Sequence, residues 1–249
     1  MKNRCVSHIL QAATALLIAA YGCSCSPRNA ETAASPKELG EPPVSMKETA
    51  QTSYDGSVSF QMQIPEDWAA GADDSGRILI YPEGLPETET EEKILALCPY
   101  TFSGVTAGEK DKAAFQALFS GNMEPYEETI KKTFAQQIAM EEKLKELENG
   151  GSFLDYLELM SPDPSIPYEE YDIPELKFQY TEYSGQKGRL IQAAYTYTEK
   201  GREITRTECF REDLPYLIST EKHETGGLSS EDIALWVADS LKVEEHFPE

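Results

Sequence analysis

The clearest pattern in the chain is an alternation of apolar and polar positions over residues 57–64. The apolar positions are Val58, Phe60, Met62 and Ile64, and serine or glutamine stands between them. A period of two predicts a strand with one buried face, and the proline at position 65 ends it. Apolar runs predict further strands at 77–82 and from residue 94 onward, and turn residues at 73–76 suggest that strand 77–82 pairs back on strand 57–64.

Two segments with helical periodicity follow these strands. The first, residues 109–121, has Ala114, Phe115, Leu118 and Phe119 on one side and ends at Gly121. The second begins near Pro125, where glutamates stand at the positive end of the helix dipole, and ends at Gly150. Its second half has a thin apolar stripe, which predicts a position on the surface of the domain.

The last third of the chain predicts an antiparallel meander and a helix. Strands are expected at 176–183, 188–198, 202–210 and 216–220, because short loops containing glycine separate these runs. A capping-box variant, Ser229 followed by Asp232, begins a helix whose apolar side chains recur at helical spacing. The elements together predict an α+β domain in which helices flank an antiparallel sheet.

This order of elements is opened by FQMQIPEDW and closed by IALWVADSL. In that respect it resembles the PsbP-like fold over roughly residues 54–243. The resemblance implies an α/β/α sandwich that binds proteins or small ions rather than catalysing a reaction. It assigns no site residue in this sequence.

The N-terminus has the features of an export signal. Lys2 and Arg4 precede an apolar stretch of about 13 residues, which is shorter than the ~20 residues that cross a bilayer. The segment Ala20-Tyr21-Gly22-Cys23 resembles the lipobox of bacterial lipoproteins, which implies acyl chains such as palmitate on Cys23. We therefore expect a signal peptide at 1–22 and a lipid anchor on the outer, extracytoplasmic face of the cell membrane. A secreted protein without lipid is the alternative.

The residues after this cysteine have the composition of a linker. Residues 24–51 are rich in alanine, glutamate, proline and serine and contain few large apolar side chains. Such a segment buries too little surface to offset its ordering entropy. We expect a lipid anchor and flexible tether at 23–51 and a single domain at 52–249.

The charge of the protein limits its partners. The sequence contains 22 basic and 44 acidic residues, a net charge of −22, and loss of residues 1–22 removes two basic residues and leaves −24. A surface of this sign repels phosphate backbones, which excludes nucleic acid and disfavours anionic lipid. Cations, basic proteins and neutral ligands remain, and solubility alone is a sufficient explanation for the acids.

Few residues offer catalytic or metal-binding chemistry. Cys98 could act as a nucleophile if His223 approached it, and Cys98 and Cys209 could instead form a disulfide in an oxidising compartment. The segment DDSG at 73–76 has small acids but lacks the ligand spacing of a calcium loop, and His246 lies in a charged tail. The sequence predicts no metal and no cofactor.

Four tyrosines are candidates for a binding surface. Tyr195 and Tyr197 share one face of their strand, and Tyr180 and Tyr183 lie in the neighbouring one. Such rings can anchor a protein or stack on a sugar, although tyrosines beneath a helix are also common in cores. The function expected is a non-enzymatic, membrane-tethered binding or accessory domain for a membrane or envelope protein partner or for a small ligand. A cysteine-dependent enzyme and an acidic cation-binding protein are the alternatives.

Overall fold

The computed structural model describes residues 35–53, 56–72, 77–84, 95–99, 115–147, 167–221, 224–225 and 228–246. The chain forms two compact units. One comprises residues 1–24 and 101–175, and the other comprises residues 25–100 and 176–249. Each unit is described by itself below.

The larger unit contains a sheet with eight strands among the described residues. Their order across the sheet is β1 (Lys37–Glu38), β7 (Lys177–Ser184), β8 (Arg189–Glu199), β9 (Arg202–Arg211), β10 (Leu214–Glu221), β6 (Leu95–Pro99), β5 (Ile78–Pro82) and β4 (Trp68–Ala72). Only the β1–β7 pair in this sheet is parallel. The meander predicted from the short loops between these runs is therefore confirmed as β7–β8–β9–β10.

The larger unit also contains a smaller sheet of three strands among the described residues. It has the order β13 (Lys242–Glu245), β3 (Val58–Pro65) and β2 (Met46–Thr52), and both pairs are antiparallel. A short hairpin, β11 (Glu224–Thr225) with β12 (Leu228–Ser229), precedes the C-terminal helix. The strand predicted at 57–64 is confirmed as β3, with its apolar positions buried.

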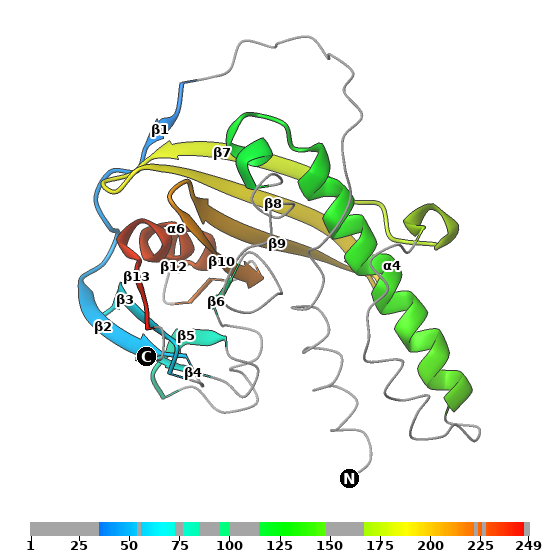
Figure 1. Cartoon of the computed structure of the whole chain (residues 1–249), viewed down its shortest axis with the longest axis horizontal. Coiled ribbons are helices and arrows are strands. Elements are labelled where there is room, and N and C mark those ends of the chain that lie inside the picture. The colour runs from blue at the N-terminus through cyan, green and yellow to red at the C-terminus, as the bar shows by residue number, and fades with distance from the viewer. Residues whose placement is uncertain are drawn as a thin grey trace. The chain divides into compact units, whose positions relative to one another are not determined.

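Helix α6 (Ser230–Ser240) packs between the two sheets (Figure 1). It contacts β8, β9 and β10 of the larger sheet and β3 of the smaller one. Every residue from Ile233 to Asp239 is buried. The sequence predicted a single apolar stripe, but Ala234, Leu235 and Ala238 are also buried because both sides of the helix face a sheet.

The start of α6 differs in detail from the prediction. Ser229 is the N-cap residue, but its side chain makes no capping hydrogen bond. Ser230 instead donates its hydroxyl to the carbonyl of Glu221 at 3.1 Å, and Glu231 and Asp232 place acidic groups in the first turn. The helix thus begins with favourable charge at its positive end rather than with a capping box.

The described elements define a mixed α+β fold, as the sequence predicted. One strand pairing was wrong, because β5 pairs with β4 and β6 rather than with β3. The intervening β4, which has the sequence WAAGA, was not predicted, since its small residues show no strong alternation. Its Trp68 is 2% exposed and belongs to the core.

The predicted tether also extends too far along the chain. Strand β1 lies at the edge of the larger sheet, and β2 pairs with β3 over its whole length. All of β1 and all of β2 except Thr52 fall within residues 23–51, so the folded domain begins before residue 52. An edge strand with charged and polar residues, such as MKETAQT, resembles a linker in composition.

The smaller unit contains residues 115–119 in helical conformation, α4 (Glu124–Leu147) and the short helix η1 (Tyr168–Glu170). The long helix begins with Glu124 and Glu127 in its first turn, as predicted. Its buried residues include Tyr126, Ile130, Ala135 and Met140. None of the helices in the described part of the chain is both long and apolar enough to cross a bilayer.

Candidate functional site

A buried arginine organises the C-terminal end of α6. Arg211 of β9 donates from Nη1 to the carbonyl oxygens of Ala238, Asp239 and Leu241, at 3.2, 2.7 and 2.7 Å. The other edge of its guanidinium pairs with both carboxylate oxygens of Asp213, at 2.6 and 3.1 Å. The last carbonyls of a helix lack partners within the helix, and a cation there is favourable. Arg211 therefore fixes where α6 ends.

The next charged group, Asp239, holds the β7–β8 turn against the same end of α6. Its two carboxylate oxygens accept the backbone N–H groups of Gln186 and Lys187, each at 3.1 Å. Gly185 permits this approach, because a Cβ atom there would come within 2.5 Å of Leu190 Cδ1 and closer still to Asp239 Oδ1. The side chains of Gln186 and Lys187 are thereby held beside α6.

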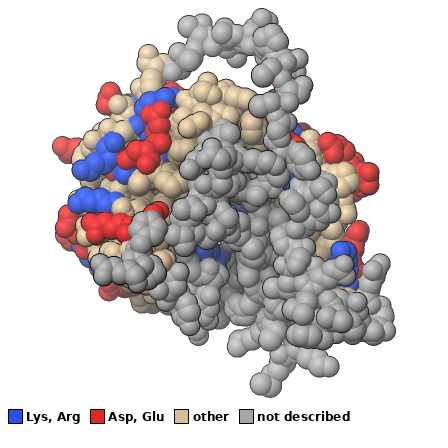
Figure 2. All heavy atoms as spheres, viewed as in Figure 1, with Lys and Arg blue, Asp and Glu red and all other residues tan. Residues whose placement is uncertain are grey.

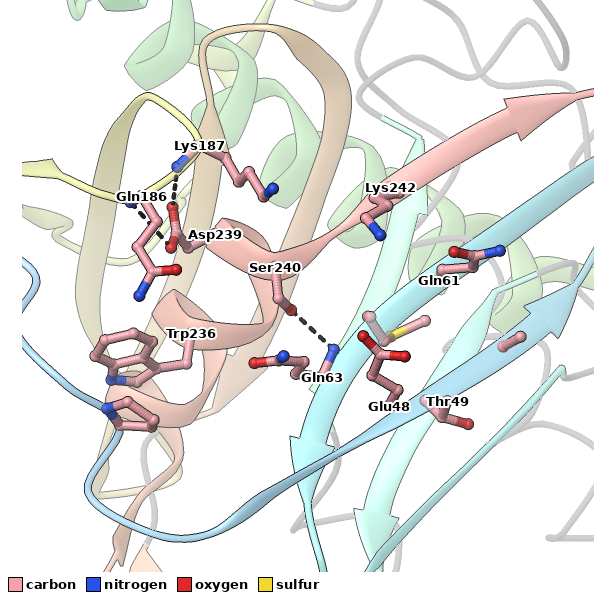
Figure 3. A pocket seen from close by; sticks show the side chains of 13 residues that line it. Glu48, Thr49, Gln61, Gln63, Gln186, Lys187, Trp236, Asp239, Ser240 and Lys242 are labelled. Carbon is pink, nitrogen blue, oxygen red and sulfur yellow. Dashed lines mark hydrogen bonds between the residues drawn. The ribbon is translucent and has the colours of Figure 1, made fainter.

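A groove of about 460 Å³ lies next to this turn (Figure 3). One wall is the C-terminal part of α6 with the β7–β8 turn, and the other surfaces come from β2, β3 and β13. The principal lining side chains are Glu48, Gln61, Gln63, Gln186, Lys187, Trp236, Asp239, Ser240 and Lys242. Its volume is in the range of small-molecule sites, but its lining is more polar than most.

Strand register arranges the floor of the groove. Gln61 stands opposite Lys242 on one side and opposite Ala50 on the other. Gln63 is two residues further along β3 and stands opposite Glu48. Residues opposite or two apart share a face, so these polar side chains project from the outer face of the small sheet while Met62 and Ile64 face the core.

Most polar side chains of the groove are not engaged by the protein. Ser240 accepts the Gln63 N–H at 2.9 Å and donates to the Val237 carbonyl, and Asp239 is occupied by the turn. Within the described residues, the side chains of Glu48, Gln61, Gln63, Gln186, Lys187 and Lys242 make no hydrogen bond or ion pair. They are available to a ligand.

Charged residues elsewhere on the larger unit are commonly paired. Arg189 contacts Glu182 at 2.7 Å and Glu212 at 3.2 Å, and Lys47 contacts Glu83 at 3.0 Å. Figure 2 shows basic and acidic side chains interleaved over the described part of one face. Exposed lysines without an ion pair are not confined to the groove, because Lys177 of β7 likewise forms none in the described part of the protein.

The predicted tyrosine site is divided between the two faces of the sheet. The register places Tyr180, Tyr195 and Tyr197 on the face opposite to α6, whereas Tyr183 stands opposite Leu190 and packs against the core under α6. Tyr183 donates its hydroxyl to Gln192 Oε1 at 3.3 Å. Side chains alternate between the two faces along a strand, so positions 180 and 183 lie on opposite faces of the sheet. The four rings therefore do not form one surface.

The rings on the other face form a row through Phe178. Its ring centroid lies 6.4 Å from that of Tyr180 and 6.2 Å from that of Tyr195, which lies 6.3 Å from Tyr197. Tyr195 and Tyr197 are each 6% exposed. Burial, reinforced by Glu208 and opposed by Arg206, raises the pKa of Tyr195. These two rings are interior side chains rather than an open binding platform.

The cysteines do not support the predicted disulfide. Cys209 is a free, buried thiol. Cys98 and Cys209 belong to β6 and β9, on either side of β10, where they stand opposite the adjacent residues Leu217 and Ile218. Two strand spacings are about 9–10 Å, whereas disulfides need Cα atoms within about 7 Å. The backbone register therefore argues against the bond.

Cys209 is also unsuited to nucleophilic chemistry. Burial, followed by the nearby carboxylates Glu231, Glu208 and Asp232, raises its pKa. A protonated, buried thiol is unreactive. The side chain of Cys98, together with His223, lies outside the described residues, as do Cys23 and the DDSG segment.

The described part of the chain contains no cluster of metal-binding side chains. No group of three or more His, Cys, Asp or Glu side chains there could hold a metal ion. His246 is exposed, as expected, but it contacts the Ser59 hydroxyl with Nε2 at 2.7 Å. Its backbone N–H also donates to the Ser57 carbonyl. The contact links the end of the chain to β3.

The sequence did not predict the groove. Its residues come from positions 42 to 242, and only the fold brings them together. A partial signal was present in Gln61 and Gln63, the polar positions of the best-predicted strand, and in the turn GQKG. Neither signal distinguishes a ligand site from an ordinary solvated face.

A search of protein-family models, of curated proteins and of solved structures finds no match to this chain.

Proposed function

We propose that this protein is a membrane-tethered extracytoplasmic lipoprotein whose folded domain binds a ligand without catalysis. The observation that supports binding best is the groove beside α6, where polar side chains of both charges converge without partners in the described part of the protein. The rigid support from Arg211 and Asp239 favours a preformed site, which reduces the ordering cost of binding.

The lipid anchor is proposed from the sequence Ala20-Tyr21-Gly22-Cys23 behind a short apolar run. Metabolic labelling with a fatty acid is expected to mark the full-length protein and its Cys25→Ser variant but not Cys23→Ser. Several acyl chains would hold the protein at the membrane without a spanning helix. Labelling of Cys23→Ser at the wild-type level would remove this part of the proposal.

The binding role can be tested by filling the groove. Ala50 is an exposed residue of β2 that lines it, and Ala72 is an exposed residue of β4 that does not. The full-length protein is recovered from its native envelope with whatever is bound, and the bound components are identified by mass spectrometry. We expect a component that Ala50→Trp loses and that Ala72→Trp retains. Identical components in all three proteins would overturn the groove as the binding site.

A PsbP-like architecture is part of the same proposal. Its support is that the two segments of the resemblance contribute β3 and α6, which pack together in the core. An anchored domain is concentrated near other membrane proteins, so even weak binding to an envelope protein partner would be effective. Electrostatic steering would make such binding decrease as the salt concentration rises.

A further inference from the structure

The groove presents both signs of charge at fixed places on the small sheet. Lys242 projects from β13 and Glu48 from β2, and these two strands lie on either side of β3 (Figure 3). A second lysine, Lys187, is held on the opposite wall by the contact of Asp239 with the turn. Because Asp239 is itself occupied by two backbone N–H groups, Glu48 is the acid that remains available.

We infer that the ligand of this groove is a short zwitterionic peptide, an inference that rests on the proposed binding function. Its carboxylate would contact Lys242 and Lys187, and its ammonium group would contact Glu48. A purely anionic ligand would be repelled by Glu48, whereas the hydroxyl groups of a neutral sugar would hydrogen-bond to the three charged side chains but would neutralise none of their charges. A zwitterion satisfies both signs.

The dimensions of the sheet indicate the length of the peptide. Two strand spacings and two residues along the strand separate the backbone at Lys242 from that at Glu48, which is about 12 Å. An extended chain spans about 3.5 Å per residue, so three residues span about 10 Å. The flexible side chains of lysine and glutamate can accommodate the difference.

The middle of the groove fits the middle of a peptide. Gln61 and Gln63 lie between the two charged ends in the register of the sheet. A glutamine side chain offers one acceptor and two donors, which complement the C=O and N–H groups of a peptide bond. These amides would recognise the backbone of the ligand rather than its side chains.

The inference is tested by calorimetric titration of the full-length protein with trialanine, N-acetyl-trialanine, trialanine amide and maltose. We expect trialanine to bind most tightly. Loss of either terminal charge should weaken binding about threefold to tenfold, in the range of a partly exposed ion pair. Affinity should decrease with added salt.

Substitutions in the groove test which side chain contacts each end of the peptide. Lys242→Gln should weaken trialanine binding about threefold to tenfold and leave the binding of trialanine amide unchanged. Glu48→Gln should weaken trialanine and its amide equally and leave the N-acetyl form unchanged. Lys177→Gln removes an exposed lysine of β7 outside the groove and should have no effect. Melting temperatures of the variants confirm that they fold.

Other outcomes would overturn the inference in distinguishable ways. Absence of trialanine binding, or equal affinity for trialanine and both blocked forms, would remove the zwitterionic peptide as the ligand class. Binding of maltose that Ala50→Trp abolishes would remove the peptide but retain the groove as a binding site. Absence of all probe binding, together with envelope components that Ala50→Trp does not change, would remove the proposed function as well.

Discussion

The C-terminal end of α6 and the groove beside it use charged side chains in opposite ways. At the helix end, Arg211 is 5% exposed and its guanidinium is bonded to three carbonyls and one carboxylate. In the groove, Lys187 and Lys242 are exposed and have no partner among the described residues. The two regions share Asp239, which lines the groove but is bonded to the turn.

This difference separates charges that maintain the fold from charges that are available for binding. Loss of the partner of a buried charge lowers the free energy of unfolding, so Arg211 and Asp239 are needed to maintain the fold. An exposed and unpaired charge contributes little to stability. The comparison therefore predicts large stability effects at the helix end and effects on ligand affinity, with little change in stability, in the groove.

The largest effect is expected for Arg211→Met. Removal of the guanidinium leaves the α6 carbonyls without their donor, and because each unsatisfied buried acceptor costs about 1–3 kcal/mol, we expect a loss of about 3 kcal/mol or more in the free energy of unfolding. The control Arg202→Met removes an exposed arginine, 62% accessible, that pairs with Glu221 at 3.2 Å. Its loss should be below about 1 kcal/mol. Urea denaturation measures the free energy of unfolding of both variants, and equal losses would show that Arg211 contributes no more to stability than an exposed arginine.

A smaller effect is expected for Gly185→Ala. The added methyl group would contact Leu190 and force the Asp239 carboxylate away from the turn. Overpacking of this kind costs about 1–3 kcal/mol in the free energy of unfolding. In the control Gly71→Ala, the nearest atom to the new Cβ is the Tyr81 hydroxyl at 3.9 Å, so the loss should be smaller. An unchanged free energy of unfolding for Gly185→Ala would show that the β7–β8 turn is not packed closely against Asp239.

The core under α6 predicts a dependence of stability on pH. Cys209 has a raised pKa because it is buried, so the folded protein retains a proton that the unfolded chain releases above about pH 8.5–9. The contribution of the Cys209 thiol to the free energy of unfolding is fully present below that pH and decreases above it, by about 1.4 kcal/mol per pH unit. Denaturation of the reduced protein between about pH 8 and 10 should give a shallower slope for Cys209→Ala than for the wild type. Equal slopes would contradict this assignment.

The smallest change in stability is expected for Lys242→Gln and Glu48→Gln. Both side chains are exposed and unpaired in the described structure, so each substitution should change the free energy of unfolding by less than about 0.5 kcal/mol. The double variant should be additive in stability, because the residues lie on different edge strands. A loss above about 1 kcal/mol in the free energy of unfolding would show that these two charges stabilise the fold.

Local patterns predicted the elements whose side chains have a clear period. Strand β3 was predicted because alternation identifies a strand with one buried face, and the meander β7–β10 because short loops separate its strand-like runs. Alternation does not identify which other strand provides the pairing, and β5 was assigned to the wrong sheet for that reason. The edge strand β2 was missed because its polar residues are also typical of linkers.

The candidate site depended still more on long-range structure. The tyrosines were selected because they lie in neighbouring predicted strands, and the register divides them because positions 180 and 183 face opposite sides of β7. The groove brings Glu48 within reach of Lys242, although 193 intervening residues separate them in the sequence. No local pattern relates two such positions.

The amino-acid sequence was sufficient to predict the α+β class, the strands of the meander and the presence of α6, because each depends on the spacing of apolar side chains and on residues that begin or separate elements. Only the tertiary structure decided that α6 lies between two sheets and that Arg211 closes its end. It also decided which polar residues surround the groove. The physical reason is that the sequence pattern reports how one segment exposes its faces, whereas pairing and convergence depend on the free energy of contacts between distant segments.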